Sequence, residues 1–298
     1  MNVKHKIART FIYLVYPIAR VIFRPITKNY LTVFLFHEVT DTPSKFQLTN
    51  LTYTTTQNFQ RNIDWIDENY KVIDISQIGN LPLENAKPLA VITFDDAWKG
   101  QVSASRLIST KHGLPVTLFL NLGAVKSRID IAALKSFGLI KVPSFNESIT
   151  LNKEEKLINE EFLNWQGDIM TINEITELDQ QDNLTLANHS LHHYPAIDLT
   201  EEQFLENVEL NERGLAKFDS FKKYYAFTFG RPGIDYKKCH VELLESMQYE
   251  YIFSADAKLN RLPLRKQETL SRINFSPMDF KKSDFWWATN KSILLRRF

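Results

Sequence analysis

Two aspartates and two histidines have the residue types and the spacing of a hydrolytic metal site. Asp95 and Asp96 end an apolar run in the stretch VITFDDAWKG, and His189 and His193 stand four residues apart in NHSLHH. On a helical turn this spacing places both rings on one side, about 5–6 Å apart at Cβ. Two imidazoles, one carboxylate and an open position are typical of catalytic zinc. One aspartate would bind the ion, whose charge offsets the carboxylate repulsion, and the other would take a proton from water.

The sequence around these residues predicts buried strands separated by helices, which must position the site. Apolar runs without polar alternation favour a parallel sheet that is covered on both faces. The predicted strands are 31–36, 89–94, 116–120, 184–187, 224–229 and 249–253. Thr171 and Thr200 each begin a capping box, which predicts a helix start, and Gly113 after His112 predicts a helix end. Strand–helix alternation over this length favours one (β/α) barrel or a related open sheet.

Polar residues gather where three of the predicted strands end. Asp95 and Asp96 follow the strand 89–94, the NHSLHH segment follows LTLA, and His37 follows LTVFLF. In (β/α) barrels the active site lies at the C-terminal ends of the strands. We therefore expect all three polar groups to line one site.

The composition is that of a soluble globular protein and excludes several classes of function. The chain has 298 residues, 44% of them hydrophobic and 24% charged, with a net charge of +1. A net charge this close to zero creates no positive electrostatic field that would attract nucleic acid. The single cysteine, Cys239, allows neither an intramolecular disulfide nor a thiolate metal cluster. No linker of Gly, Ser or Pro divides the chain, and the sequence sets no oligomeric state.

The first 30 residues and a stretch near the middle differ from the rest. Residues 1–30 mix basic and apolar side chains, but Pro17 and Arg20 break the apolar run and no small-residue cleavage site follows. They predict either an amphipathic helix packed on the domain or a helix on a membrane surface, retained in the protein. We therefore expect a cytoplasmic protein or one that binds a membrane peripherally. Residues 31–298 read as one catalytic domain, with an insertion around 125–168 over one end of the barrel.

The segments TFDDA, HSLHH and FTFGRPG resemble the motifs of the polysaccharide deacetylases, carbohydrate esterase family four. The resemblance spans roughly residues 31–275. It implies a distorted (β/α) barrel with about seven strand–helix units and a metal-dependent enzyme that removes acetyl groups from N-acetylated sugars. It makes Asp95 the general base and Asp96, His189 and His193 the metal ligands. Zinc is expected as the ion, and nickel or cobalt would suit two histidines and an aspartate equally.

The sequence departs from the family pattern in two places. The family takes an acid histidine from a C-terminal motif, which is absent here. LFLFHEVTD resembles instead an N-terminal segment of the circularly permuted members that act on poly-N-acetylglucosamine, which makes His37 the acid. In FTFGRPG the register is open: Arg231 would orient Asp95, and the backbone N–H near Phe229 would serve the oxyanion. Trp98, two residues after Asp96, is a candidate for stacking on a sugar.

The expected reaction is hydrolysis of an N-acetyl group from a poly- or oligosaccharide, free or lipid-linked. The expected partners are this saccharide and, through the N-terminal segment, a membrane surface, with no nucleic acid. Two alternatives stay open at this point. The chain could be a carbohydrate-binding relative that has lost turnover, or a hydrolase of another amide or ester, because fold does not fix the substrate.

Overall fold

Seven parallel strands close a barrel in the part of the chain that the computed structural model describes, namely residue 18 and residues 27–81, 87–138, 160–264 and 269–274. The strands of the closed ring, in spatial order, are β1 (Tyr30–Phe36), β5 (Leu89–Asp95), β6 (Val116–Leu120), β7 (Leu184–Asn188), β8 (Phe221–Ala226), β9 (Tyr251–Ser254) and β11 (Leu270–Asn274). The first strand lies between β5 and β11 and pairs with both in parallel, as in Val33 with Val91 and with Arg272. This closure selects the barrel over the open sheet.

Short strands extend the ring at its margins. β4 (Lys71–Val72) pairs with β5, and β10 (Asn260–Arg261) pairs antiparallel with the start of β1. A separate parallel pair joins β2 (Glu38–Val39) to β3 (Tyr53–Thr54) just beyond the end of β1.

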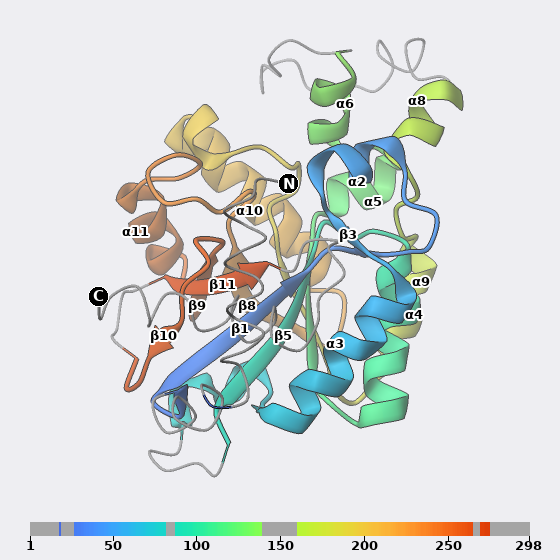
Figure 1. The fold of residues 1–298 in the computed structure, drawn as a ribbon. Helices are drawn as coiled ribbons and strands as arrows, with labels where there is room; N and C mark the ends of the chain where they lie inside the picture. The colour runs from blue at the N-terminus through green and yellow to red at the C-terminus, as the bar shows by residue number, and fades with distance from the viewer. Residues whose placement is uncertain (1–17, 19–26, 82–86, 139–159, 265–268, 275–298) are drawn as a thin grey trace, which may run out of the picture.

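Helices surround the barrel (Figure 1). They are α2 (Lys45–Asn50), α3 (Thr56–Asn69), α4 (Gly100–Leu107), α5 (Leu122–Ser127), α6 (Ile131–Phe137), α8 (Glu160–Gln166), α9 (Ile172–Leu178), α10 (Glu201–Leu215) and α11 (Lys238–Ser246), with shorter turns at Ile75–Asn80, Ile108–His112 and Ala196–Asp198. Thr171 and Thr200 form the predicted capping boxes, and Gly113, at φ 62°, ends the turn that contains His112. Figure 1 shows α3 and α4 on one flank of the barrel and α10 and α11 on the other, while α2, α5, α6 and α8 gather at its upper end.

The strands are apolar on both faces because each face packs against a different layer. Leu31, Val33, Val91 and Phe119 belong to the cluster that fills the barrel. Neighbours such as Phe94 belong instead to the cluster between the strands and the helices. Double-sided burial removes the polar alternation of a half-exposed strand, which is why the apolar runs predicted these strands.

Among the strands of the ring, two differ from the prediction by two residues or more and one was missed, and the short strands β2, β3, β4 and β10 were not predicted either. β8 ends at Ala226, so Thr228 and Phe229 lie in the turn that follows, and Phe229 has a left-handed φ of 58°. β9 begins at Tyr251 instead of Tyr249. β11, which closes the ring, was not predicted because its sequence LSRIN carries an arginine in its centre.

The N-terminal segment and the insertion around 125–168 lie only partly within the described residues. No helix within the described residues is long and apolar enough to cross a bilayer. The N-terminal segment falls outside those residues, except for Ile18 and the stretch from 27 onward. Of the insertion expected around 125–168, residues 139–159 also lie outside them, and the division into a segment and one domain stays a prediction.

Candidate metal centre

A sharp turn at the end of β5 brings the two aspartates to the mouth of the barrel. Asp95 is the last residue of the strand, and Asp96 and Ala97 follow with left-handed φ angles of 78° and 58°. Such angles cost a non-glycine residue roughly 1–2 kcal/mol each. The backbone therefore turns immediately after Asp95, and both carboxylates are buried, at 3% and 5% exposure.

The two histidines come from the end of β7 and the loop after it. His189 directly follows the strand, and its backbone N–H donates to the carbonyl of Leu120 on β6 at 3.1 Å. Ser190 then takes a left-handed φ of 69°, so His193 lies in a loop and not on the helical turn that its spacing suggested. The two rings nevertheless lie close together, with centroids 5.4 Å apart.

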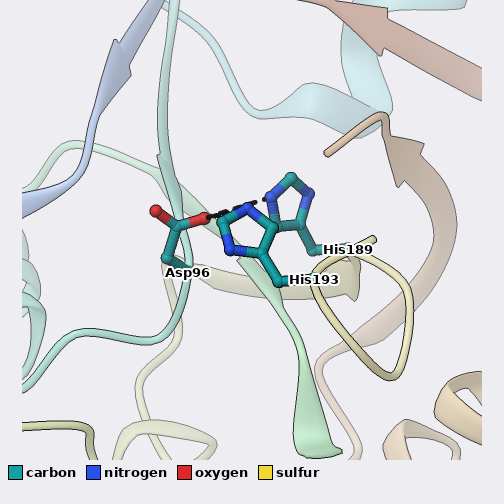
Figure 2. Close-up of side chains that lie close together, drawn as sticks. All are labelled: Asp96, His189 and His193. Carbon is teal, nitrogen blue, oxygen red and sulfur yellow. Dashed lines mark ion pairs between the residues drawn. The ribbon is translucent and has the colours of Figure 1, made fainter. Parts of the chain in front are cut away.

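Asp96, His189 and His193 converge on one point (Figure 2). Oδ1 of Asp96 lies 3.2 Å from Nε2 of His189 and 3.3 Å from Nε2 of His193. One ligand atom from each residue lies within 4.8 Å of the others. Around a tetrahedral ion with ligand bonds near 2.0–2.1 Å, neighbouring ligand atoms are about 3.3 Å apart. The three side chains fit a divalent ion of zinc size.

Hydrogen bonds on the far side of each ring leave the Nε2 atoms free for an ion. Nδ1 of His189 lies 2.9 Å from the carbonyl oxygen of Ala226, which accepts only if Nδ1 carries the proton. Nδ1 of His193 lies 2.8 Å from Oδ2 of Asp130, a fully buried carboxylate. Such contacts fix the tautomer and the orientation of metal-binding imidazoles.

Asp130 was not predicted as part of the site. Its Oδ1 accepts the N–H of Ala133 and so caps α6, while Oδ2 binds His193. Its backbone N–H donates to Gln166 at 2.7 Å. An aspartate before an apolar helix reads as a cap, and nothing in the sequence connects it to a histidine in a distant loop.

Asp95 is held by an arginine, but by Arg272 of β11 and not by Arg231. Nη1 and Nη2 of Arg272 donate to the two carboxylate oxygens of Asp95 at 2.6 and 2.7 Å, and both side chains are buried. Nε of Arg272 donates to the carbonyl of Ser254, so all three nitrogens of the fork are used. Arg231 pairs instead with Asp235 in the loop after β8, and 58% of its side chain is exposed. The expected contact between Arg231 and Asp95 is therefore wrong.

His37 reaches the same site from the end of β1. Its Nε2 lies 3.9 Å from Oδ2 of Asp96, and 13% of its side chain is exposed. Burial lowers the pKa of His37, although Asp96 and Asp95 oppose that shift. The ring therefore lies beside the aspartate pair and keeps an opening to solvent.

The two candidate substrate-contact residues lie in opposite environments. Trp98 is fully buried, packs against Phe46 and donates its Nε1 hydrogen to Oδ2 of Asp96 at 3.2 Å. A buried indole offers no face to a sugar, so the stacking role expected for Trp98 is wrong. Phe229 is 44% exposed and stacks on His193, with centroids 4.9 Å apart and the planes 3° from parallel.

The charged side chains of the centre shift the pKa values of one another. Burial favours the neutral form of Asp96, but His193, His189 and His37 outweigh it and hold its pKa well below the usual range. Burial likewise opposes the charge on His193, yet Asp130 and Asp96 raise its pKa to about 9. The carboxylates around His193 thus stabilise a positive charge at this position, and a divalent ion would supply that charge in place of the proton.

The fold and the site together define a (β/α)-barrel protein with a buried His₂Asp centre at the C-terminal ends of the strands. A family model described as polysaccharide deacetylase matches residues 83–252, which include Asp95, Asp96, His189 and His193. The chain belongs to this family, and its activity class is that of a carbohydrate deacetylase, a hydrolase.

Solved structures of deacetylases share the fold. The deacetylase PplD of Streptococcus pyogenes, solved in complex with acetate, matches with a TM-score of 0.62 at 13% identity, over 87% of this chain and 98% of that one. IcaB from Ammonifex degensii matches with a TM-score of 0.59 at 16% identity, over 87% and 97%. The deacetylase domain of BpsB from Bordetella bronchiseptica matches with 0.53 at 12%, over 84% and 98%. No curated protein matches at the sequence level.

Proposed function

We propose that the protein is a metal-dependent N-deacetylase that hydrolyses the acetamido group of an N-acetylated sugar within a poly- or oligosaccharide, free or lipid-linked. One observation carries this proposal: the two adjacent aspartates have different partners. Asp96 faces two imidazoles, whereas Asp95 is held by Arg272 and lies 3.8 Å from Nε2 of His189. A general base beside a metal-binding group is the arrangement that amide hydrolysis needs.

Asp96, His189 and His193 would hold the ion, with Asp130 and the carbonyl of Ala226 fixing the two rings. When bound, a divalent ion polarises the carbonyl and favours ionisation of a nearby water. Zinc suits the ligand set best, and nickel or cobalt would bind the same atoms.

Asp95 and His37 would move the protons of the reaction. Asp95, oriented by Arg272, takes a proton from water as the water oxygen forms a bond to the acetamide carbon. The C–N bond then breaks, and the imidazolium form of His37 donates a proton to the leaving amine; because burial lowers the pKa of His37, this form releases its proton readily. Acetate and a free amino sugar are the products. A positioned proton donor of this kind typically contributes about 10²–10⁴-fold.

The surface beside the centre supports a saccharide as the substrate. The ring of Phe229 is half-exposed next to His193, where it can pack against the apolar face of a sugar or the acetyl methyl. The backbone N–H near Phe229, in a left-handed turn at the mouth of the barrel, is the proposed donor to the oxyanion.

Acetate release from N-acetylglucosamine oligomers tests the proposal, with and without a chelator, for the wild type and for Asp95→Asn. We expect acetate that requires the metal and that disappears in Asp95→Asn, while the variant still binds one ion per chain. Saccharide binding without acetate, unaffected by chelator, would favour a binding module. A tightly bound ion with neither acetate nor saccharide binding would favour a hydrolase of another amide or ester.

We also propose that the basic and apolar N-terminal segment holds the protein peripherally on a membrane. Its charge pattern supports contact with anionic lipid. Sedimentation with vesicles that contain anionic lipid, for the full chain and for a chain that begins at residue 27, tests this. Equal sedimentation of the two chains would exclude the segment as the anchor.

A further inference from the structure

Glu38, the neighbour of His37, is a buried carboxylate that the proposed chemistry does not use. It begins β2, directly beyond the end of β1, and only 4% of it is exposed. Burying a carboxylate costs free energy unless hydrogen bonds replace its water. The partners of Glu38 therefore indicate what its burial achieves.

Three donors from three elements meet this carboxylate. Oε1 accepts the backbone N–H of Val39 at 2.7 Å, and Oε2 accepts Nε2 of Gln47 in α2 at 3.3 Å. The backbone N–H of Gly100, the first residue of α4, also bonds to Glu38. Because the first N–H groups of a helix lack partners within the helix, the carboxylate supplies one that α4 needs.

The contact at the start of α4 is close enough to require glycine. A Cβ atom at Gly100 would lie 2.0 Å from Oε1 of Glu38 and 2.1 Å from the carbonyl oxygen of Val39. No side chain therefore fits at position 100. The strand end after His37 and the start of α4 are thus in direct contact.

This contact joins two segments that carry proposed catalytic groups. His37 immediately precedes Glu38, and Asp96 lies four residues before Gly100 on the strained turn with left-handed angles at Asp96 and Ala97. Strained turns persist only where their surroundings hold them. Nε2 of His37 and Oδ2 of Asp96 lie 3.9 Å apart across this junction.

We propose that Glu38 is a positioning residue: its carboxylate ties the strand end that carries His37 to the start of α4 and so fixes His37 relative to Asp96. Side chains of neighbouring strand residues point to opposite faces, so Glu38 acts through the backbone and not by touching the His37 ring. The kinetic consequence rests on the proposed function of His37, whereas the placement of the ring does not.

The kinetic test uses Glu38→Gln, which keeps the size of the side chain and removes its charge. Displacement of a reacting group by about 1 Å can cost up to 10²-fold, so we expect kcat for acetate release to fall about 10- to 100-fold, with KM and metal content unchanged. In a His37→Ala background the same substitution should cause no further fall. Additive losses in the double variant would overturn action through His37.

Asp179→Asn is the matched control. The carboxylate of Asp179 accepts the backbone N–H groups of Asp219 and Ser220 at 3.1 and 2.9 Å, next to the start of β8 at the opposite end of the barrel. Its loss should lower the melting temperature without changing kcat. An equal fall of kcat in both variants would mean that Glu38 acts only through stability.

A second readout does not depend on activity. The imidazole NMR signals of His37, assigned by their loss in His37→Ala, should shift in zinc-loaded Glu38→Gln and stay in place in Asp179→Asn. Unshifted signals would overturn the proposal. If Glu38→Gln does not fold, Glu38→Asp, which keeps the charge but shortens the side chain, gives the same comparison. If the wild type releases no acetate, the proposed function fails and the NMR comparison alone decides the role of Glu38.

Discussion

Arg272 holds Asp95 by two parallel hydrogen bonds inside the barrel, with Nη1 to Oδ1 at 2.6 Å and Nη2 to Oδ2 at 2.7 Å. The arginine is fully buried and also lies over the ring of Phe119, 5.3 Å from its centroid. A planar fork of this kind fixes both the position and the orientation of a carboxylate. The partner that the proposed general base needs is thus built into the strand that closes the barrel.

We expect Arg272→Met to lower the free energy of unfolding by about 3–5 kcal/mol, because it leaves the charge of Asp95 buried without a partner. The double variant with Asp95→Asn should recover much of this loss, since it removes the stranded charge. Urea unfolding followed by circular dichroism measures both. Arg106→Met is the control: Arg106 and its partner Glu177 are both largely exposed, so this pair should contribute no more than about 1 kcal/mol. Equal losses at the two arginines would contradict the assignment.

The sequence predicted those residues of the centre that stand at the end of a buried strand. Asp95, Asp96, His189 and His37 stand at the ends of apolar runs, and parallel strands bring such ends to one face. The structure confirms this convergence. The prediction of a helical turn for His189 and His193 was wrong, because Ser190 turns the chain with a left-handed φ, yet the rings still meet.

The partners of these residues could not be predicted, because they come from distant segments. Arg272 is separated from Asp95 by 177 positions and lies in a strand whose sequence is partly polar, whereas Arg231 was expected as the partner because FTFGRPG resembles a family motif. Asp130 reads as an ordinary helix cap. Trp98 follows the aspartates closely enough to suggest a sugar contact, but its indole is needed inside, as a donor to Asp96. Sequence patterns identify which residues end strands, and only packing shows what supports them.

Asp130→Asn should weaken zinc binding about 10- to 100-fold, the usual cost of losing a carboxylate behind a histidine ligand. An asparagine can keep the cap on α6 through its side-chain oxygen, but loss of the buried charge beside His193 should also lower the melting temperature of the apoprotein. Competition with a chelating dye measures the affinity. Thr171→Ala, which removes the cap of α9, is the control and should lower stability while leaving zinc affinity intact. Unchanged zinc affinity in Asp130→Asn would show that the ring of His193 needs no carboxylate.

The stability of the protein should carry a pH dependence that comes from Glu38. Burial raises the pKa of this carboxyl from 4.5 to about 7, although hydrogen bonds from Val39, Gly100 and Gln47 oppose the shift. Between these values the folded chain binds more protons at Glu38 than the unfolded chain, so this residue's contribution to stability falls as pH rises from about 4.5 to about 7.

Glu38→Gln should remove that dependence. Urea unfolding at several pH values between 4.5 and 7.5 gives the free-energy difference between wild type and variant, in which the other titrating groups cancel. The difference should move in favour of the variant as pH rises through this window and level off above it. A difference that stays constant with pH would mean that Glu38 ionises normally in the folded protein.

Phe229→Ala and Trp98→Phe should separate substrate contact from support of the metal ligand. Phe229 is exposed over His193, so its loss should raise KM for N-acetylglucosamine oligomers several-fold and change the melting temperature little, because little buried surface is lost. Trp98→Phe keeps an aromatic ring in the core but removes the Nε1 hydrogen bond to Asp96, so it should weaken zinc binding and leave KM at saturating zinc unchanged. Ile234→Ala, at another exposed apolar side chain in the loop after β8, is the control for Phe229 and should alter neither quantity. If Trp98→Phe raised KM while Phe229→Ala did not, the sugar would bind against the indole, and the loop between Asp96 and Gly100 would have to open in solution.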